Sequence, residues 1–579
     1  MLSAIRATFF SVLLSLALIP SAPAQSPLDS RITVAHPGFV LLKSDLKKTI
    51  DLTTPVEQKQ WENIEGYIDT FIIGIDETRE VQVQVMTGIS PTGYLICVPL
   101  QSASDPSKVF RENLDSLGYK IMRNPEDHKL YTIESDANEY GWMKLDAELR
   151  YAYFMIITDK SLLPKLKDIV LNAKLTPTEL NENMIAELKN SEASAAAITH
   201  RTSAFKPIRD EQMKLIKQRP DEKATTFQLR QASSRQLLDE AERIMSEADR
   251  LLVTLTMDRT DSALPKVKLR TTASAIPGTS METTISQYGV QPDAFAGLMR
   301  LSGTALSLRA NHPLDELRKK HLKETLTLTR ADIEASLKAS KSLSDPEKAA
   351  FSKFVAGALG VVESSVDSGN LNGAVESIPH GDDHFTTVSV FLSPAAAELA
   401  TILPLLSEAG KGNSVQMNLD KVGDVNIHKI QIAEGFISAF DRLFGSHEEL
   451  FVGVGPQRVW LASGKSGLEV LKSTIPLVGE PAANPVVLRV EGNMLPWAKL
   501  FDSIAKKVKT GTLTADDEKI RREQARVRER AIVAMATQDD FSFVITTEGG
   551  TWIGEFTSNT GLLRFVGKMM SAFSKENFE

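Results

Sequence analysis

Cysteine is almost absent from this chain, since Cys97 is the only one among 579 residues. A single cysteine cannot form a disulfide within its own chain, so packing and hydrogen bonding must hold the fold together. Cys97 lies in the alternating stretch of residues 94–98, which predicts a strand, and no histidine stands near it in the sequence. We therefore expect a buried, unreactive thiol rather than a nucleophile.

Long apolar runs are also scarce, and the clearest one lies at the N-terminus. Arg6 precedes a mostly apolar stretch, residues 7–19, and the small residues Ala22 and Ala24 follow it. This pattern is typical of a secretory signal peptide. We expect residues 1–24 to be a signal peptide that is cleaved after Ala24, and the mature chain to be soluble and exported to the periplasm or the extracellular space. An uncleaved membrane anchor is the alternative, although it would need a longer apolar run, and no later stretch predicts a transmembrane segment.

An excess of positive charge is lacking as well. The net charge is -8, and the hydrophobic and charged shares, 42% and 24%, are ordinary for a globular protein. A mildly acidic chain is a poor candidate for binding nucleic acid. The locally basic residues 521–530 also contain glutamates, and acidic residues 516–518 precede them, so they predict a solvent-exposed helix with internal ion pairs. We expect no nucleic-acid partner.

Familiar catalytic motifs are missing too. The sequence contains neither a G-x-S-x-G elbow nor an H-E-x-x-H pair. Residues 462–466 (ASGKS) resemble the end of a phosphate-binding loop, but Val459 stands where that loop needs its first glycine. We interpret the segment as a strand-to-helix turn capped by a serine, and we expect no bound cofactor.

One short segment carries candidate metal ligands: His380, Asp382, Asp383 and His384 stand within five residues. Imidazole and carboxylate groups at this density suit zinc or a harder cation. However, the segment falls in a predicted hairpin loop, where Gly381 and the aspartates favour a turn by themselves. The sequence leaves a metal site and a bare turn open, and it favours the turn.

The chain does contain a repeated order of predicted elements. Residues 75–114 predict a turn, a strand, a hairpin loop, a strand and a helix, and residues 366–403 predict the same series with little identity. Two further pairs of predicted strands recur at one constant spacing: residues 196–200 with 486–490, and residues 251–257 with 541–547. Paired strands separated by single helices favour an antiparallel sheet with helices on one face. We predict an α+β fold of two tandem copies of such a sheet, in residues 25–288 and 289–579.

Three hypotheses for function follow. The first is an exported, non-enzymatic protein that binds a protein or a cell-envelope component, supported by the signal peptide, the duplication and the missing catalytic motifs. The second is a carrier of an apolar, lipid-like ligand, because helices such as residues 351–362 have wide apolar faces. The third is a hydrolase whose site is assembled from distant residues. Exposed aromatic residues on a sheet would favour the first, an apolar cavity the second, and clustered histidines or paired carboxylates the third.

Overall fold

The chain forms two compact units, seen here in a computed structural model. The structure describes residues 30–86, 93–101, 105–176, 178, 180, 183–190, 192–219, 222–258, 265–298, 300–382, 384–410, 412–432, 450–507, 515–536 and 538–578. Unit 1 comprises Met1–Leu215, Glu240–Pro277 and Leu563–Glu579, and unit 2 comprises Ile216–Asp239 and Gly278–Leu562. The predicted signal peptide, residues 1–24, lies outside the described residues. The predicted division at residue 288 stays a prediction.

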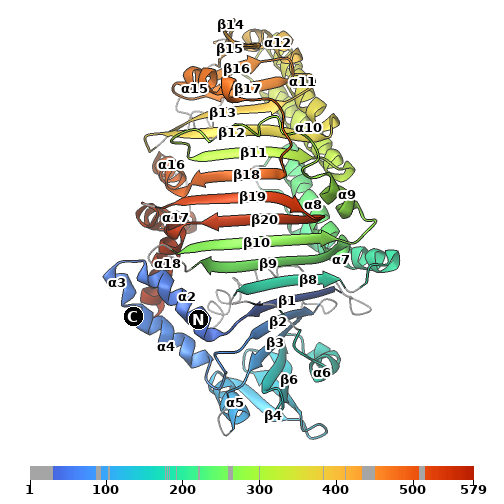
Figure 1. The fold of residues 1–579 in the computed structure, drawn as a ribbon, viewed down its shortest axis with the longest axis vertical. Helices are drawn as coiled ribbons and strands as arrows, with labels where there is room; N and C mark the ends of the chain where they lie inside the picture. The colour runs from blue at the N-terminus through green and yellow to red at the C-terminus, as the bar shows by residue number, and fades with distance from the viewer. Residues whose placement is uncertain are drawn as a thin grey trace. The chain divides into compact units, whose positions relative to one another are not determined.

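The described strands of unit 1 form one antiparallel sheet in the order β4-β5-β6-β7-β3-β2-β1-β8-β9-β10 (Figure 1). In chain order the strands are β1 (Ser30–His36), β2 (Val81–Met86), β3 (Gly93–Pro99), β4 (Tyr119–Arg123), β5 (Leu130–Ser135), β6 (Tyr140–Asp146), β7 (Tyr151–Ile157), β8 (Met184–Asn190), β9 (Ala248–Asp258) and β10 (Lys266–Ala275).

The described strands of unit 2 form an antiparallel sheet in the order β14-β15-β16-β17-β13-β12-β11-β18-β19-β20 (Figure 1). In chain order the strands are β11 (Leu306–Pro313), β12 (Asn370–His380), β13 (His384–Leu392), β14 (Ser414–Val422), β15 (Val425–Gln431), β16 (Leu450–Val454), β17 (Arg458–Ser463), β18 (Val486–Asn493), β19 (Asp540–Glu548) and β20 (Thr551–Ser558). If the strands are counted along the chain within each unit, β1 corresponds to β11 and β10 to β20. Corresponding strands therefore pair in the same order in both units. The predicted α+β class with antiparallel sheets is confirmed, and superposition of the units stays a prediction.

The described helices alternate with these strands. They are α2 (Phe39–Asp51), α3 (Pro55–Gln58), α4 (Trp61–Phe71), α5 (Pro106–Ser116), α6 (Leu163–Leu171), α7 (Ala195–Leu215), α8 (Ala224–Glu247), α9 (Ser280–Gln287), α10 (Glu316–Ala339), α11 (Asp345–Asp367), α12 (Glu398–Ile402), α13 (Leu405–Glu408), α15 (Gly467–Thr474), α16 (Met494–Lys507), α17 (Ala515–Ala534) and α18 (Thr560–Phe578). Local sequence sets several of their starts. The carboxylate of Asp315 accepts from the Arg318 N–H at the start of α10, and Ser344 and Glu347 form a capping box at the start of α11.

Helices cover both faces of the unit 1 sheet, where the sequence predicted one. Leu166 of α6 packs in one buried cluster with Cys97 and Tyr153, whereas Phe110 of α5 packs in another with Val98. Because neighbouring residues of a strand point to opposite faces, α5 and α6 lie on opposite sides of β3.

One predicted strand is a helix. Residues 195–201 begin α7, and the strand that pairs with β1 on the side away from β2 is β8, where no strand was predicted. Three successive alanines favour a helix, and only pairing with β1 and β9 reveals β8 as a strand. The constant spacing therefore holds for β9 and β19 but not for β8 and β18.

Helix α11 is the one described helix that is long and apolar enough to cross a membrane by length and composition alone. Its Val361 packs in a buried cluster with Leu399 and Leu403, although only 28% of its apolar window is buried. The expectation that the mature chain has no transmembrane segment stays a prediction.

Candidate functional site

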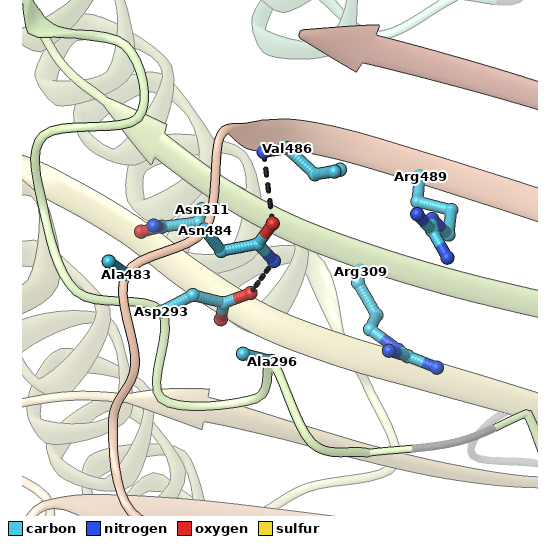
Figure 2. A pocket seen from close by; sticks show the side chains of 8 residues that line it. All are labelled: Asp293, Ala296, Arg309, Asn311, Ala483, Asn484, Val486 and Arg489. Carbon is cyan, nitrogen blue, oxygen red and sulfur yellow. Dashed lines mark hydrogen bonds between the residues drawn. The ribbon is translucent and has the colours of Figure 1, made fainter.

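A cavity of about 260 Å³ lies on one face of the unit 2 sheet. Its lining residues come from β11, from β18, and from two covering segments, residues 293–296 and 483–484 (Figure 2). They are Asp293, Ala296, Arg309, Asn311, Ala483, Asn484, Val486 and Arg489. Beneath the same covering stretch, Phe295 and Leu298 are buried against Val390 and Trp460, so this stretch is anchored to the sheet by apolar packing.

Two arginines face each other in the floor of the pocket. Arg309 of β11 is the direct cross-strand partner of Arg489 of β18. Side chains on directly opposed residues point to the same face with their Cβ atoms about 5 Å apart, and like charges in this position destabilise a sheet. The sequence could have placed almost any polar residue here at lower electrostatic cost, so the arginine pair needs an explanation.

The side of the pocket away from the arginines has its polar groups already bonded. Asp293 is buried; one carboxylate oxygen accepts from the Phe295 N–H at 2.8 Å and the other from the Asn484 amide at 2.8 Å. The Asn484 side-chain oxygen in turn accepts from the Val486 N–H at 3.1 Å (Figure 2). Asp293 also pairs through its backbone with Ala482 in both directions. These bonds join the two covering segments to each other.

A group of three asparagines on β11 and β12 holds the residues just before the first covering segment on the sheet. The Asn311 amide donates to the Gln291 carbonyl at 2.8 Å, and its oxygen accepts from Asn370 at 2.9 Å and from Asn372 at 3.1 Å. Asn372 also donates to the Pro292 carbonyl at 3.3 Å. Asn311 of the pocket lining therefore helps to hold the chain before Asp293 on the sheet.

The arginine side differs, because no hydrogen-bond partner for the buried Nε of Arg309 exists among the described residues. Burial lowers the pKa of Arg309, and the neighbouring charge of Arg489 lowers it further, while Glu376, Glu491 and Asp293 oppose this shift. An arginine stays protonated even so. For Arg489, the ion pair present is a long one of 3.9 Å with Glu491, two residues along the same strand. Figure 2 shows both guanidinium groups on the side of the pocket opposite the bonded Asp293–Asn484 pair.

Glu376 lies on the same sheet face, next to the arginine pair and almost fully buried, with 1% of its surface exposed. It stands directly opposite Ser307 and accepts a hydrogen bond from that hydroxyl at 2.5 Å, and it accepts a longer one from the Leu301 N–H at 3.4 Å. Burial raises the pKa of Glu376, whereas its hydrogen bonds with Ser307 and Leu301 and the charge of Arg309 act to lower it. Glu376 thus holds Leu301, which follows the covering segment of residues 293–296, on the sheet.

The segment with the candidate metal ligands is a hairpin turn, as predicted from its glycine and aspartates. His380 ends β12, His384 begins β13, and the two residues are cross-strand partners. Asp382 forms an ion pair with Lys499 at 2.9 Å, while Asp383 lies outside the described residues. No group of three or more candidate ligands gathers among the residues that the structure describes. Whether this turn binds a cation stays a prediction.

Two other sequence expectations are now located. Cys97 is buried, as expected, and burial raises the pKa of its thiol to about 12. Residues 462–466 comprise the end of β17 and the turn into α15, with Gly464 at φ 92°, a conformation that favours glycine for backbone reasons alone. Ser466 is at the N-cap but makes no side-chain capping bond, so the predicted serine cap is wrong.

Four aromatic residues lie together on β19 and β20, on the sheet face opposite the one that carries the pocket. Phe543 and Phe556 are cross-strand partners, and Phe541 and Trp552 share their face. We call these four residues the aromatic stripe. All four are half-buried, and the rings of Phe541 and Phe556 lie 6.4 Å apart. Val544 directly follows Phe543, so its side chain points to the face opposite the aromatic stripe. Because Val544 pairs with Arg489, the aromatic stripe and the pocket occupy opposite faces.

Sequence reasoning missed the two pocket arginines, although a partial signal was present. In β11 the residues Ser307, Arg309 and Asn311 alternate with apolar ones, as do Arg489 and Glu491 in β18. Such alternation predicts one polar face on each strand, which usually means a face in water. Only the register of β11 against β18 brings the arginines together.

Comparison with known proteins finds no family model, no curated protein and no solved structure that matches this chain.

Proposed function

We propose that this chain is an exported, non-enzymatic binding protein that holds a protein or cell-envelope partner by an acidic group placed at Arg309 and Arg489. One observation carries the proposal: Arg309 and Arg489 lie directly opposite each other on neighbouring strands, and both line the pocket. Like charges on directly opposed strand residues destabilise a sheet, and the nearby carboxylates of Glu376 and Asp293 accept hydrogen bonds from other groups. A bound acidic group would satisfy both arginines.

Binding fits this pocket better than hydrolysis does. Its described lining contains no histidine and a single carboxylate, Asp293, whose two oxygens already accept hydrogen bonds. A general base must reach the proton that it removes, and Asp293 is committed to the covering segments. The lining is also largely polar, so the pocket gives no support to an apolar-ligand carrier. The half-buried aromatic stripe supports contact with a partner, because such rings are enriched where proteins meet.

Purification from the native host followed by native mass spectrometry tests the proposal. We expect the wild-type protein to retain a bound component, and we expect the R309Q/R489Q variant to lose it because the two cationic groups are gone. R250Q is the matched control, since Arg250 is also a strand arginine but is paired with Glu187. Retention by R309Q/R489Q equal to that of the wild type would refute the role of the pocket.

Export is a separate part of the proposal and rests on the sequence of residues 1–24. N-terminal sequencing of the protein recovered outside the cytoplasm should begin at Gln25, because Ala22 and Ala24 fit a signal-peptidase site. A chain that begins at Met1 would contradict cleavage.

A further inference from the structure

We propose that the pocket of unit 2 binds an oxyanion, a phosphate or carboxylate group, between the guanidinium groups of Arg309 and Arg489. This inference rests on the proposed function, because it names the chemistry of the group that the same site takes.

The hydrogen-bonding inventory of the pocket points to a ligand that only accepts. The polar lining groups of Asp293, Asn311 and Asn484 are already bonded to the covering segments or to the sheet. The guanidinium groups remain, and these only donate. Ionised phosphate and carboxylate oxygens are pure acceptors and match these donors, whereas the two guanidinium charges would repel an ammonium group.

The geometry of the arginine pair suits an oxyanion in particular. A guanidinium presents a planar fork of donors that matches two oxygens of a carboxylate or a phosphate. Two such forks on directly opposed strand positions can hold one group from both sides. The opposed charges also explain why an anion is favoured, since it replaces a repulsion between the arginines by two attractions in a partly buried setting.

Competition inside the protein comes from Glu491. Its carboxylate lies 3.9 Å from Arg489, which is too long for a strong charge-assisted hydrogen bond. An arriving oxyanion can therefore replace this contact at small cost. Glu376 does not compete in the same way, because it is held by Ser307 and the Leu301 N–H beneath the covering stretch.

The size and walls of the cavity limit the rest of the ligand. About 260 Å³ is at the small end for a ligand site, which is enough for the acidic group and a few further atoms. The remaining lining residues are Ala296, Ala483 and Val486, which are small and apolar. We therefore expect the acidic group of a larger molecule or a small organic acid, with the rest of a larger molecule outside the cavity.

Calorimetric titration of the full-length mature chain with inorganic phosphate and with succinate, at constant ionic strength, tests this. We expect the wild type to bind at least one probe, and R309Q and R489Q each to bind it at least tenfold more weakly. R309K should also bind more weakly than the wild type, because lysine keeps the charge but lacks the planar fork of donors. E491Q should bind more tightly because the internal competitor is removed, and R250Q should bind like the wild type.

The outcomes separate this inference from the proposed function. Binding of neither probe, or equal binding by the wild type and R309Q/R489Q, would overturn the oxyanion site. If the native protein still retains a component that these variants lose, the proposed function stands without it. A preference for phosphate assigns the group to a phosphorylated ligand, and a preference for succinate assigns it to a carboxylic acid. Circular dichroism of each variant confirms that a loss of binding is not a loss of folding.

Discussion

Unit 1 and unit 2 carry different side chains on matching rungs of similarly ordered sheets. A rung is a row of directly opposed residues that runs across neighbouring strands. In each unit we take the rung that lies two residues before the last residue pair of β3 with β7, or of β13 with β17. The rung of unit 1 runs through Tyr153, Cys97, Gln82, Ala35 and Ile185. The rung of unit 2 runs through Trp460, Val390, Ala374, Arg309 and Arg489. An apolar pair, Ala35 and Ile185, thus stands where unit 2 has its arginine pair.

The chain that precedes β8 in unit 1 and the covering segments of unit 2 are attached to their sheets by different side chains. In unit 1 the buried Gln82 amide donates to the Thr176 carbonyl, and its oxygen accepts from the Thr176 N–H at 3.0 Å. In unit 2, asparagines make this attachment, so Arg309 and Arg489 take no part in it. The strand order therefore provides a covered sheet face in each unit, and the choice of a few side chains decides whether that face is closed or can bind a ligand.

Exchanging these residues should have the largest effect. We expect the double variant A35R/I185R to lose about 3–5 kcal/mol of unfolding free energy, because two buried charges would have no partner. Ala35 and Ile185 are only 1% and 4% exposed. The reverse exchange, R309A/R489I, should stay within about 1 kcal/mol of the wild type, because it relieves a like-charge pair. Urea unfolding measures both. A neutral A35R/I185R variant would show that unit 1 has room for the same site.

The next rung gives a smaller effect that depends on pH. It places Glu376 opposite Ser307 in unit 2 and Gln84 opposite Thr33 in unit 1. We expect E376A to lose about 2 kcal/mol, because it leaves buried donors unpaired, and E376Q to lose less. Since burial raises the folded-state pKa of Glu376 above its ordinary 4.5, the folded state binds the proton more tightly than the unfolded state does.

The sign of that pH dependence follows from linkage. The stabilisation is fully present below the unfolded-state pKa and is lost as the pH rises through the higher folded-state pKa. Unfolding free energies measured from pH 4 upwards should therefore fall more steeply in the wild type than in E376Q. Parallel curves for the two proteins would show that Glu376 is not shifted upwards.

Replacing Cys97 by the residue on the matching rung should change little. We expect C97V, which introduces the side chain that Val390 provides in unit 2, to stay within about 1 kcal/mol of the wild type, because the swap keeps a small apolar group in the core. In the wild type, burial raises the thiol pKa to about 12, so iodoacetamide should not modify the folded protein at pH 8. Rapid labelling under native conditions would contradict the buried position.

The smallest effect is expected at the hairpin between β12 and β13. We expect H380A/H384A to change neither bound zinc, measured by elemental analysis, nor the melting temperature, because the turn is stabilised by its own backbone. A loss of zinc together with a lower melting temperature would establish a metal site there, since metal binding contributes directly to folding stability.

The sequence by itself determined the α+β class and the local pairs of strands. The hairpins β2–β3, β9–β10, β12–β13 and β19–β20 join neighbouring stretches, so alternating apolar residues and a turn between them are enough to predict them. Strand β8 was missed, and the helices on a second face were not predicted, because both depend on partners far away in the chain.

The candidate site was decided by tertiary structure alone. Arg309 and Arg489 are far apart in the sequence, and each looked like a polar residue on the wet face of its own strand. Their meeting depends on the register between β11 and β18, and the pocket that they line is completed by covering segments that the Asp293–Asn484 bond joins. A shift of one residue in that register would turn one arginine to the other face of the sheet. Such a non-local choice is made by the packing of the whole unit, and no local pattern encodes it.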